Sequence, residues 1–336
     1  MDSAQLLALV QALKGRTVAV VGDVVADEFV YGRVARVSRE APVLILEYDT
    51  AEIVAGGAGN AANNVAALGG RAALVAIVGR DDPGRRLVKS LRAGVDSRRV
   101  IRAADATPVK TRILAGGVHS AKQQVVRIDR GVGTPVRAGS RAALERVALD
   151  ACERADAVLI SDYGSGLVTP ALASRIHARL KRVGHPVPVL VDTRYQLLKY
   201  RGLTACTPNE SEVEQALGIR INDDRKVLER AGRDILAQTA MEAVLITRGS
   251  RGMALFIKGT PTVHIPIVGS DEIADVTGAG DTVMATMALA LASGATFERA
   301  AWLANYAAGL VVMKRGTATV SGQELRKAIE QASGRT

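Results

Sequence analysis

The chain has 336 residues, enough for two average domains or one large α/β domain. Its 48% hydrophobic and 23% charged residues are ordinary globular values, which excludes a chain that is disordered throughout. The net charge of +10 would suit an anionic partner, either nucleic acid or a phosphorylated small molecule. Basic residues are spread along the chain, however, and aromatic residues make up only 3% of it, so we expect no nucleic-acid partner.

The sequence also argues against a membrane-bound, secreted or zinc protein. No apolar run reaches the ~18 residues that a membrane helix needs, and no basic segment followed by an apolar one marks a signal peptide. The two cysteines, Cys152 and Cys206, form no CxxC pair, and the four histidines lack metal-ligand spacing. We therefore expect a cytoplasmic protein with no membrane partner.

In chain order, short apolar runs alternate with amphipathic stretches, beginning with a helix whose apolar face holds Leu6, Val10 and Leu13. The apolar runs are typical of buried strands and lie at Thr17–Val21, Ala72–Val78, Ala157–Ile160, Val187–Val191 and Ala243–Thr247. Amphipathic stretches predict helices at Asn60–Leu68, Pro83–Leu91, Ala138–Glu153, Pro170–Lys181 and Asn222–Gln238, and the chain ends in two long helices, Gly278–Ala292 and Phe297–Lys314. This order predicts a single α/β domain over residues 1–336, a doubly wound, mostly parallel sheet with helices on both faces.

Two segments interrupt the alternation, at about residues 30–50 and 108–129. In both, apolar residues alternate with polar ones, as in Val109–Ile113, which is typical of strands. We predict a small antiparallel sheet inserted into the α/β body, forming a lid over the strand ends where α/β proteins bind ligands. The same pattern also fits two exposed hairpins without a role.

Two polar motifs follow near the amino end. Asp23 and Asp27 come directly after the first strand, where carboxylates could bind sugar hydroxyls or simply be solvated. The stretch from Gly56 to Asn60 opens a helix and admits close approach of a ligand, and the amide of Asn60 can both donate to and accept from a hydroxyl.

A dinucleotide-binding pattern is present but misplaced. Gly57, Gly59 and Ala62 fit GxGxxA, with Asp81 about twenty residues further on. That fingerprint should follow the first strand of its βαβ unit, but the first strand here ends at Val21. The match therefore only weakly favours a dinucleotide site.

Two motifs suit phosphate and magnesium. Thr207–Glu212 follows a short strand and opens a helix, where Glu212 could hold a hydrated Mg²⁺ or serve with Asn209 as an ordinary helix cap. The turn from Thr247 to Gly249 ends another strand and suits contact with a phosphate.

The most informative motif is Asp275–Thr282, a glycine-rich turn that leads straight into a helix. Its glycines can expose successive backbone N–H groups, and the helix adds its unpaired N–H groups and partial positive charge. Such an anion site suits a transferring phosphoryl group, and Asp281 beside it could accept a proton from a substrate hydroxyl. The alternative is a plain turn with an acidic first helical turn.

Together, and in this order, the motifs resemble those of the ribokinase-like (phosphofructokinase B) carbohydrate kinases over nearly the whole chain. Two segments match the signatures of that family, Gly56–Leu68 and Asp275–Asp281. The resemblance implies a ribokinase-like α/β fold with a β-sheet lid, ATP with Mg²⁺ as the donor, and an alcohol group as the acceptor.

The resemblance also implies roles for single residues. Asp281 would be the catalytic base, and the backbone of Gly278, Ala279 and Gly280 would form the anion hole. The residues that would bind the substrate are Asp23, Asp27, Gly56, Gly57, Asn60 and Asp162. Those that would bind ATP are Asn209, Thr247, Gly249, Gly252 and Asn305, while Glu212 would order Mg²⁺ through water.

Within the family, the chain is most similar to the D-glycero-β-D-manno-heptose 7-phosphate kinases, which phosphorylate the anomeric hydroxyl to give the 1,7-bisphosphate. The matching segments are Arg36–Val43, Gln123–Asp129, Ser161–Tyr163, Ala304–Val312 and Gly316–Ser321. In many bacteria this kinase is fused to a nucleotidylyltransferase. Because the chain ends at Thr336, we expect the stand-alone kinase, paired with a second copy through its lid as a homodimer.

Two positions depart from the heptose kinases. Ser165 stands where they usually carry Lys, and Asp192-Thr193-Arg194 replaces their Asp-Pro-Lys. Arg194 keeps a charge that could bind a substrate phosphate, as could Lys110 and Arg112 on the lid.

These departures leave the acceptor open to a fructose phosphate, a pentose or a nucleoside. Two other classes also stay open. Gly57 and Gly59 would support a dinucleotide-dependent oxidoreductase. A catalytically silent sugar-binding regulator is the other, although the intact Asp281 and Gly278–Gly280 argue against it.

Overall fold

The computed structural model describes residues 2–104, 106–116, 122–131, 137–268 and 275–333, and ten strands of these residues form a central sheet. In spatial order they are β14 (Val263–Ile265), β13 (Met253–Ile257), β12 (Ala243–Thr247), β11 (Ala205–Cys206), β10 (Val189–Thr193), β9 (Ala157–Asp162), β1 (Thr17–Gly22), β4 (Arg71–Gly79) and β5 (Val95–Asp96), with β6 (Val100–Ala104) paired to β4. The strands from β5 to β12 pair in parallel, as predicted, whereas the unpredicted β13 and β14 add an antiparallel edge.

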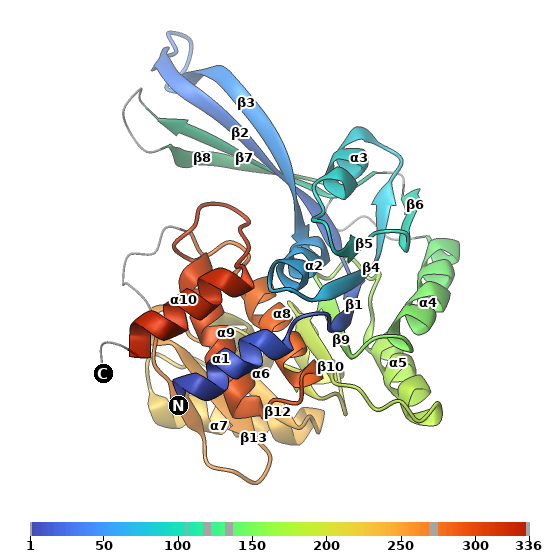
Figure 1. The fold of residues 1–336 in the computed structure, drawn as a ribbon. Helices are drawn as coiled ribbons and strands as arrows, with labels where there is room; N and C mark the ends of the chain where they lie inside the picture. Colours follow the sequence, from blue (N-terminus) through green and yellow to red (C-terminus); the bar gives the residue numbers. More distant parts are fainter. Residues whose placement is uncertain (1, 105, 117–121, 132–136, 269–274, 334–336) are drawn as a thin grey trace.

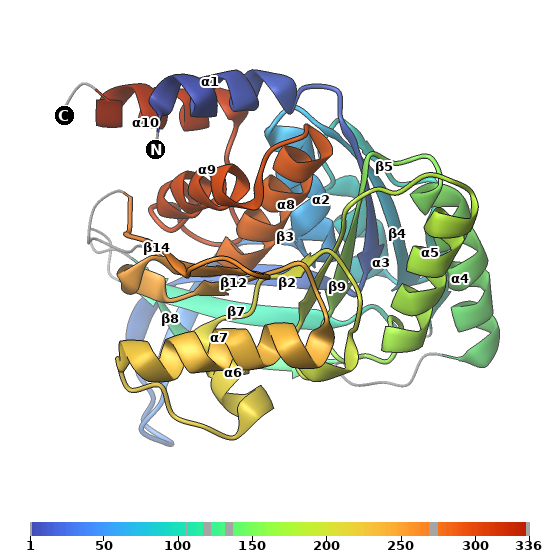
Figure 2. The same cartoon turned by 90° about the horizontal axis from the view of Figure 1, so that it is seen from below.

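Strand β1 explains why helices cover both faces of the sheet. Val18 and Val20 pack into one apolar core and Ala19 and Val21 into the other, because successive side chains of a strand point to opposite faces. The first core is covered by α1 (Ser3–Ala12), α2 (Ala58–Ala67), α8 (Ala279–Ala292), α9 (Phe297–Val311) and α10 (Gly322–Ser333), and the second by α4 (Ala138–Cys152), α5 (Pro170–Arg182) and α7 (Arg225–Thr239) (Figure 2). Two shorter helices, α3 (Asp82–Lys89) and α6 (Glu210–Leu217), complete the set in the described residues.

The carboxyl-terminal prediction was wrong in one respect. The chain does not end in two helices, because α10 follows α9 and buries Leu325 and Ile329 beside α1. The apolar residues of α10 are few, so the sequence pattern alone does not predict this helix, which gains its stability by packing against α1. No helix among the described residues is both long enough and apolar enough to cross a membrane.

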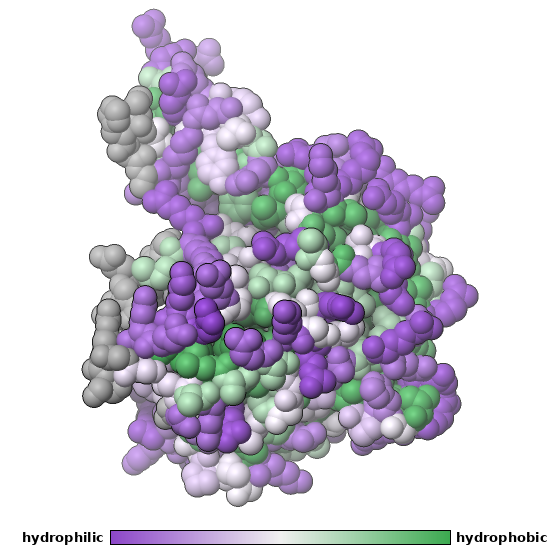
Figure 3. All heavy atoms as spheres, viewed as in Figure 1, coloured by the Kyte–Doolittle hydropathy of each residue, from purple (hydrophilic) through white to green (hydrophobic). Residues whose placement is uncertain are grey.

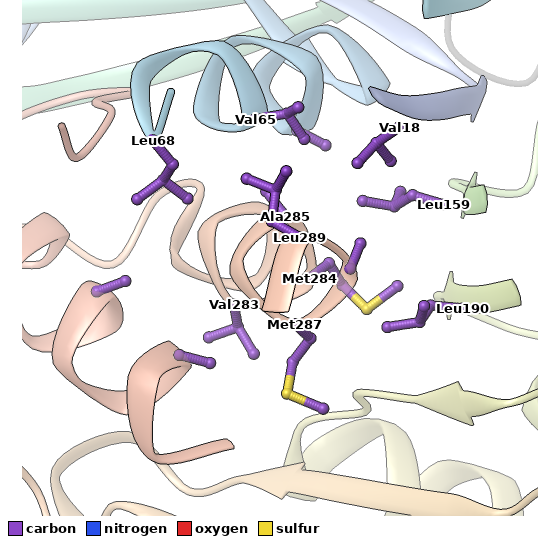
Figure 4. Packing of buried hydrophobic residues seen from close by; sticks show 14 of the residues in the cluster. Val18, Val65, Leu68, Leu159, Leu190, Val283, Met284, Ala285, Met287 and Leu289 are labelled. Carbon is purple, nitrogen blue, oxygen red and sulfur yellow. The ribbon is translucent and has the colours of Figure 1, made fainter. Parts of the chain in front are cut away.

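Helix α8 lies at the centre of the first core. Its residues from Asp281 to Ala290 are all buried. In Figure 4, Val65 of α2 and Leu68, which follows that helix, face it on one side, and Leu159 and Leu190 of the sheet face it on another. A helix held on every side in this way keeps its amino end in a fixed position.

A second sheet of four strands projects from the α/β body (Figure 1). Its order is β3 (Leu44–Gly57), β2 (Val24–Val37), β7 (Val109–Gly116) and β8 (Gln123–Arg130), and we call it the lid sheet. It confirms the predicted small β-sheet, but β2 and β7 pair in parallel. Strand β2 starts before residue 30 and β3 runs on past residue 50, so Asp27, Gly56 and Gly57 belong to this sheet. Figure 3 shows apolar residues gathered where the lid sheet meets the body.

Candidate active site

Polar residues converge at the carboxyl ends of the parallel strands. Asp23 follows β1, Tyr163 follows β9, Thr207 follows β11, and Asp192 and Thr247 lie within the last residues of β10 and β12. Because these strands are parallel, their carboxyl ends share one edge of the sheet, and ligands of α/β proteins bind there.

A cavity of about 470 Å³ opens at this edge. Its lining includes these predicted site residues: Asn209, Glu212, Thr247, Gly249, Gly252, Gly278, Ala279, Gly280, Asp281 and Asn305. They come from strands, turns and helices that are far apart in the sequence. The structure therefore brings the predicted nucleotide-binding, magnesium-binding and catalytic residues together in one pocket.

The amino end of α8 faces this pocket. Gly278 precedes the helix with φ of +79°, and a Cβ there would lie 2.5 Å from Nδ2 of Asn60, so the position needs glycine. No side chain caps the helix, which leaves its first N–H groups available to a ligand. The positive end of the helix and these N–H groups together form an anion site.

Asp281 lies in the first turn of α8 and is only 4% exposed. One carboxylate oxygen accepts from Nδ2 of Asn60 at 2.8 Å and the other from the Tyr163 hydroxyl at 3.1 Å. Burial raises the pKa of Asp281 to about 7, aided by the charge of Asp27 and opposed by these two hydrogen bonds. A carboxyl with a pKa near neutrality suits a group that takes up a proton during turnover.

Asn60 serves Asp281 rather than an open ligand site. Its amide nitrogen donates to Asp281, and its amide oxygen accepts from Nδ2 of Asn64 at 3.2 Å. The side chain is 1% exposed. The structure therefore places Asn60, predicted as a sugar ligand, as a positioning residue for the carboxylate.

Asp23 is held by the segment that follows β9. Its carboxylate accepts from the backbone N–H of Tyr163 at 2.8 Å and from the hydroxyl of Ser165. Burial raises the pKa of Asp23, while these hydrogen bonds lower it. Ser165, the residue that departs from the heptose kinases, therefore has a local partner.

Asp27 is held by the lid sheet and the carboxyl-terminal loop. Arg112 of β7 forms an ion pair with it at 2.5 Å, and the hydroxyl of Thr317 donates to it at 3.1 Å. The side chains of Arg112 and Asp27 are 12% and 8% exposed. A Cβ on Gly56 would lie 2.2 Å from the carboxylate, so that glycine lets Asp27 approach the backbone.

Two basic side chains, Lys110 and Arg194, form no ion pair within the described residues, and the charge of Lys110 acts on Asp281. Lys110 of β7 lies 5.5 Å from the centre of the Tyr163 ring. Arg194 follows β10 and is exposed, with its guanidinium 5.7 Å from the Tyr195 ring. Burial and the charges of Arg127 and Arg194 lower the pKa of Lys110, which shows that these cations lie close enough to repel one another.

Asp162 is not among the residues that line the pocket. Its carboxylate accepts from Thr193, from Tyr200 at 2.8 Å and from the N–H of Gly164 at 3.0 Å, and it is 2% exposed. Asp162 thus joins the ends of β9 and β10, and its part in substrate binding stays a prediction.

Asn209 and Glu212 turn out to be both a helix cap and part of the pocket. Each side chain bonds to the backbone N–H of the other residue at 2.9 Å, a capping box that starts α6. Burial raises the pKa of Glu212, and its second oxygen makes no hydrogen bond with the described residues.

Among the pocket residues that were not predicted as site residues are two with ionisable side chains, Tyr163 and Asp192. Both lie in segments already noted for their family resemblance, but neither residue type by itself marks a site. The carboxylate of Asp192 makes no hydrogen bond within the described residues. Burial and the nearby charge of Glu212 raise the pKa of Asp192. The signal that could have found them is their place at strand ends.

A family profile described as pfkB family carbohydrate kinase matches residues 16–324. The chain belongs to the pfkB family of carbohydrate kinases. It is 42% identical, over 99% of its length, to a protein of Caulobacter vibrioides called bifunctional protein HldE. A protein of the same name from Geobacter metallireducens is 43% identical over 91% of the chain. The chain covers 67% and 61% of these relatives, so it spans about two thirds of their length.

Solved structures share the fold of this pfkB kinase. A ribokinase from Arabidopsis thaliana, complexed with ribose and ATP, has a TM-score of 0.71 at 21% identity and matches 94% of this chain and 99% of its own. Phosphofructokinase-2 from Escherichia coli, in complex with fructose-6-phosphate, has a TM-score of 0.74 at 16% identity and matches 95% of this chain and 99% of its own. The predicted ribokinase-like fold is confirmed.

Membership in the pfkB family makes the protein a carbohydrate kinase. The oxidoreductase alternative is thereby wrong. The residue that would have bound a dinucleotide ribose, Asp81, instead caps α3 by accepting from Gly84 N–H at 3.0 Å. The glycines of that pattern follow a lid strand, β3, rather than the first strand of a βαβ unit.

Proposed function

We propose that this kinase transfers the γ-phosphoryl group of ATP to the anomeric hydroxyl of D-glycero-β-D-manno-heptose 7-phosphate. The similarity of the chain to the heptose 7-phosphate kinases names the acceptor, and its relatives called HldE support that choice. The observation that carries the proposal is the pair Lys110 and Arg194. Lys110, whose charge acts on Asp281, and Arg194, whose charge acts on Lys110, suit an acceptor that bears a phosphate of its own.

The mechanism follows from the amino end of α8. Asp281 orients the acceptor hydroxyl and takes its proton as the new O–P bond forms and the bond to ADP breaks. The N–H groups of Gly278 and Gly280 make no backbone hydrogen bond in the described residues and are available to the charge that develops on the transferred group, whereas the N–H of Ala279 donates to Val276. Asn60 and Tyr163 each hold one carboxylate oxygen, so the base keeps its orientation throughout.

Mg²⁺ fits the same pocket. In the described residues no three His, Cys, Asp or Glu side chains gather as a metal site, but Glu212 and Asp192 both line the pocket. One or two carboxylates with substrate phosphates are the usual protein environment of Mg²⁺. We infer that Glu212, with Asp192 beside it, holds hydrated Mg²⁺, which supplies neutralisation of the ATP phosphates.

The test is ADP release with Mg·ATP and a set of acceptors. The set contains the heptose 7-phosphate, the unphosphorylated heptose, fructose 6-phosphate, ribose and a nucleoside. We expect selective turnover of the heptose 7-phosphate. Selective turnover of another acceptor would refute the proposed substrate and leave the kinase chemistry in place.

Two variants test the phosphate site. Lys110→Met and Arg194→Met should each raise KM for the sugar phosphate about tenfold or more, since each removes a charge-assisted contact. Lys122→Met is the matched control, because Lys122 is also a lid lysine over a tyrosine ring but forms an ion pair with Asp49. An unchanged KM in both test variants would contradict the proposed phosphate site.

We also propose that two copies pair through the lid sheet as a homodimer. The lid sheet exposes a set of large apolar residues: Val34, Val37, Val43, Leu44, Tyr48, Val125, Val126 and Ile128. Several large apolar side chains exposed on one small sheet favour a protein partner. Sedimentation should detect a dimer that Val126→Glu weakens, and a wild-type monomer at all concentrations would refute it. The free thiols Cys152 and Cys206 agree with a reducing compartment such as the cytoplasm.

A further inference from the structure

Tyr163 connects the lid sheet to the candidate catalytic base. Its hydroxyl donates to one oxygen of Asp281 at 3.1 Å, and its ring lies beside the lid sheet. Nζ of Lys110, on β7, lies 5.5 Å from the centre of the Tyr163 ring. The backbone N–H of Tyr163 donates to Asp23 at 2.8 Å, which anchors the residue to the end of β1. Tyr163 thus touches the body, the lid and Asp281 at once.

We infer that Tyr163 is a positioning residue that couples the lid sheet to Asp281, holding the carboxylate in its reactive orientation when Lys110 lies over the ring. The inference rests on the proposed role of Asp281. It adds a residue whose own atoms exchange no proton with the substrate and which acts through the carboxylate.

The geometry gives a physical reason for this role. With Asn60 alone, the carboxylate of Asp281 would be held at one oxygen and could rotate about its last bond. The Tyr163 hydroxyl holds the second oxygen, so the plane of the carboxylate is set. Burial, with the charges of Asp281 and Asp192, raises the pKa of Tyr163 far above neutrality, so its hydroxyl remains a donor.

The ring position depends on the lid. One edge of the ring packs 3.4 Å from where a Cβ of Gly57 would lie, and the cation of Lys110 is attracted to its face. Gly57 ends β3 and leaves room for the ring, and Lys110 lies on β7, so the lid sheet borders the ring at both positions. A displaced lid would therefore leave the ring, and with it the hydroxyl, less constrained.

The charged groups around Asp281 make the coupling measurable. Asp27 raises the pKa of Asp281, whereas Lys110 and the hydroxyl of Tyr163 lower it. Apart from burial, the charges of Glu212 and Asp281 raise the pKa of Asp192. Loss of either the hydroxyl or the lysine should shift the ionisation of Asp281 in the same direction, upward.

The first experiment compares the pH dependence of kcat/KM in the wild type and in Tyr163→Phe, which keeps the ring and removes the hydroxyl. We expect the acid limb to move up by about one pH unit and kcat to fall about tenfold. Because the substrates titrate identically in both assays, the difference reports the enzyme. A profile that superimposes on the wild type overturns the inference.

Tyr200→Phe is the matched control. Tyr200 also donates to a buried carboxylate, Asp162, at 2.8 Å, but that carboxylate does not line the pocket. A merely structural hydrogen bond should lower Tm in this variant and leave the acid limb in place. An equal shift of the acid limb in both variants would mean that the effect is general, and would overturn the special role of Tyr163.

A double-mutant cycle tests the coupling to the lid. Lys110→Met should move the acid limb upward in the wild type and less in the Tyr163→Phe background, because part of its effect passes through the hydroxyl. Lys122→Met, the lid control, should move it in neither. Additive shifts would overturn the coupling.

A measurement without turnover separates this inference from the proposed function. The side-chain ¹³C carboxyl resonance of Asp281, assigned by its loss in Asp281→Asn, can be titrated with no substrate present. We expect it to titrate at higher pH in Tyr163→Phe than in the wild type, whatever the acceptor is. Near-normal turnover in Asp281→Asn would refute the catalytic assignment, while an unchanged titration would refute Tyr163.

Discussion

Replacing Asp281 by Asn should stabilise the folded protein at high pH while it removes most of the activity. The ordinary pKa of an Asp is 3.8, and burial raises that of Asp281 to about 7. A raised pKa means that the folded state disfavours the charged carboxylate. Asp281 therefore costs no folding free energy below its pKa in the unfolded state. The free energy of unfolding declines as the pH rises from that pKa toward the pKa of Asp281 in the folded state.

The size of the effect follows from the two pKa values. The raised pKa of Asp281 costs the folded state about 2 kcal/mol at pH 5, where the folded carboxyl is protonated and the unfolded one is not, and about 4 kcal/mol at pH 8, where both are charged. An Asn has no such cost, although it meets the donors of Asn60 and Tyr163 with one acceptor instead of two. That mismatch is the same at every pH. The free energy of unfolding of the variant, relative to the wild type, should thus rise by about 2 to 3 kcal/mol from pH 5 to pH 8.

The assay is urea unfolding of both proteins at pH 5, 6, 7 and 8, with turnover measured on the same samples. Turnover should fall at least about 100-fold in Asp281→Asn, since a general base is lost. Asp162→Asn is the control, because that carboxylate accepts three hydrogen bonds and should be needed at every pH. A difference in unfolding free energy that does not change with pH would refute the raised pKa of Asp281.

Three further changes have expected outcomes. Gly278→Ala should lower Tm and turnover together, since the new Cβ lies 2.5 Å from Nδ2 of Asn60 at a φ of +79°; a fully active, equally stable variant would contradict this. Arg112→Met should cost about 3 to 5 kcal/mol in urea unfolding, because it leaves the buried Asp27 unpaired, and a loss below about 1 kcal/mol would show that water solvates that carboxylate. Glu212→Gln should raise the Mg²⁺ concentration needed for half-maximal turnover, and identical Mg²⁺ titrations would remove Glu212 from the metal site.

Local pattern was sufficient for much of the fold. The apolar run Thr17–Val21 predicted a buried strand, and the helix before it and those after it followed from their periodicity. These features depend on neighbours in the sequence, so they can be read without a tertiary structure. Helix α10 was not predicted, because its apolar stripe is short and the helix gains its stability by packing on α1. Strands β13 and β14 were not predicted, because they are short and form only as the edge of a sheet whose other strands lie elsewhere in the chain.

The sequence by itself also determined which local features form the site: a glycine turn leading into a helix, a carboxylate in the first turn of that helix, and polar residues at strand ends. Only the tertiary structure decided how they are used. Asn60 and Asp281 are 221 residues apart, yet they form one hydrogen bond. Asp162 and Tyr163 are neighbours, yet one carboxylate joins two strands while the adjacent hydroxyl reaches the base. Local pattern shows where a strand ends, but the direction of each side chain beyond that end depends on contacts between distant segments.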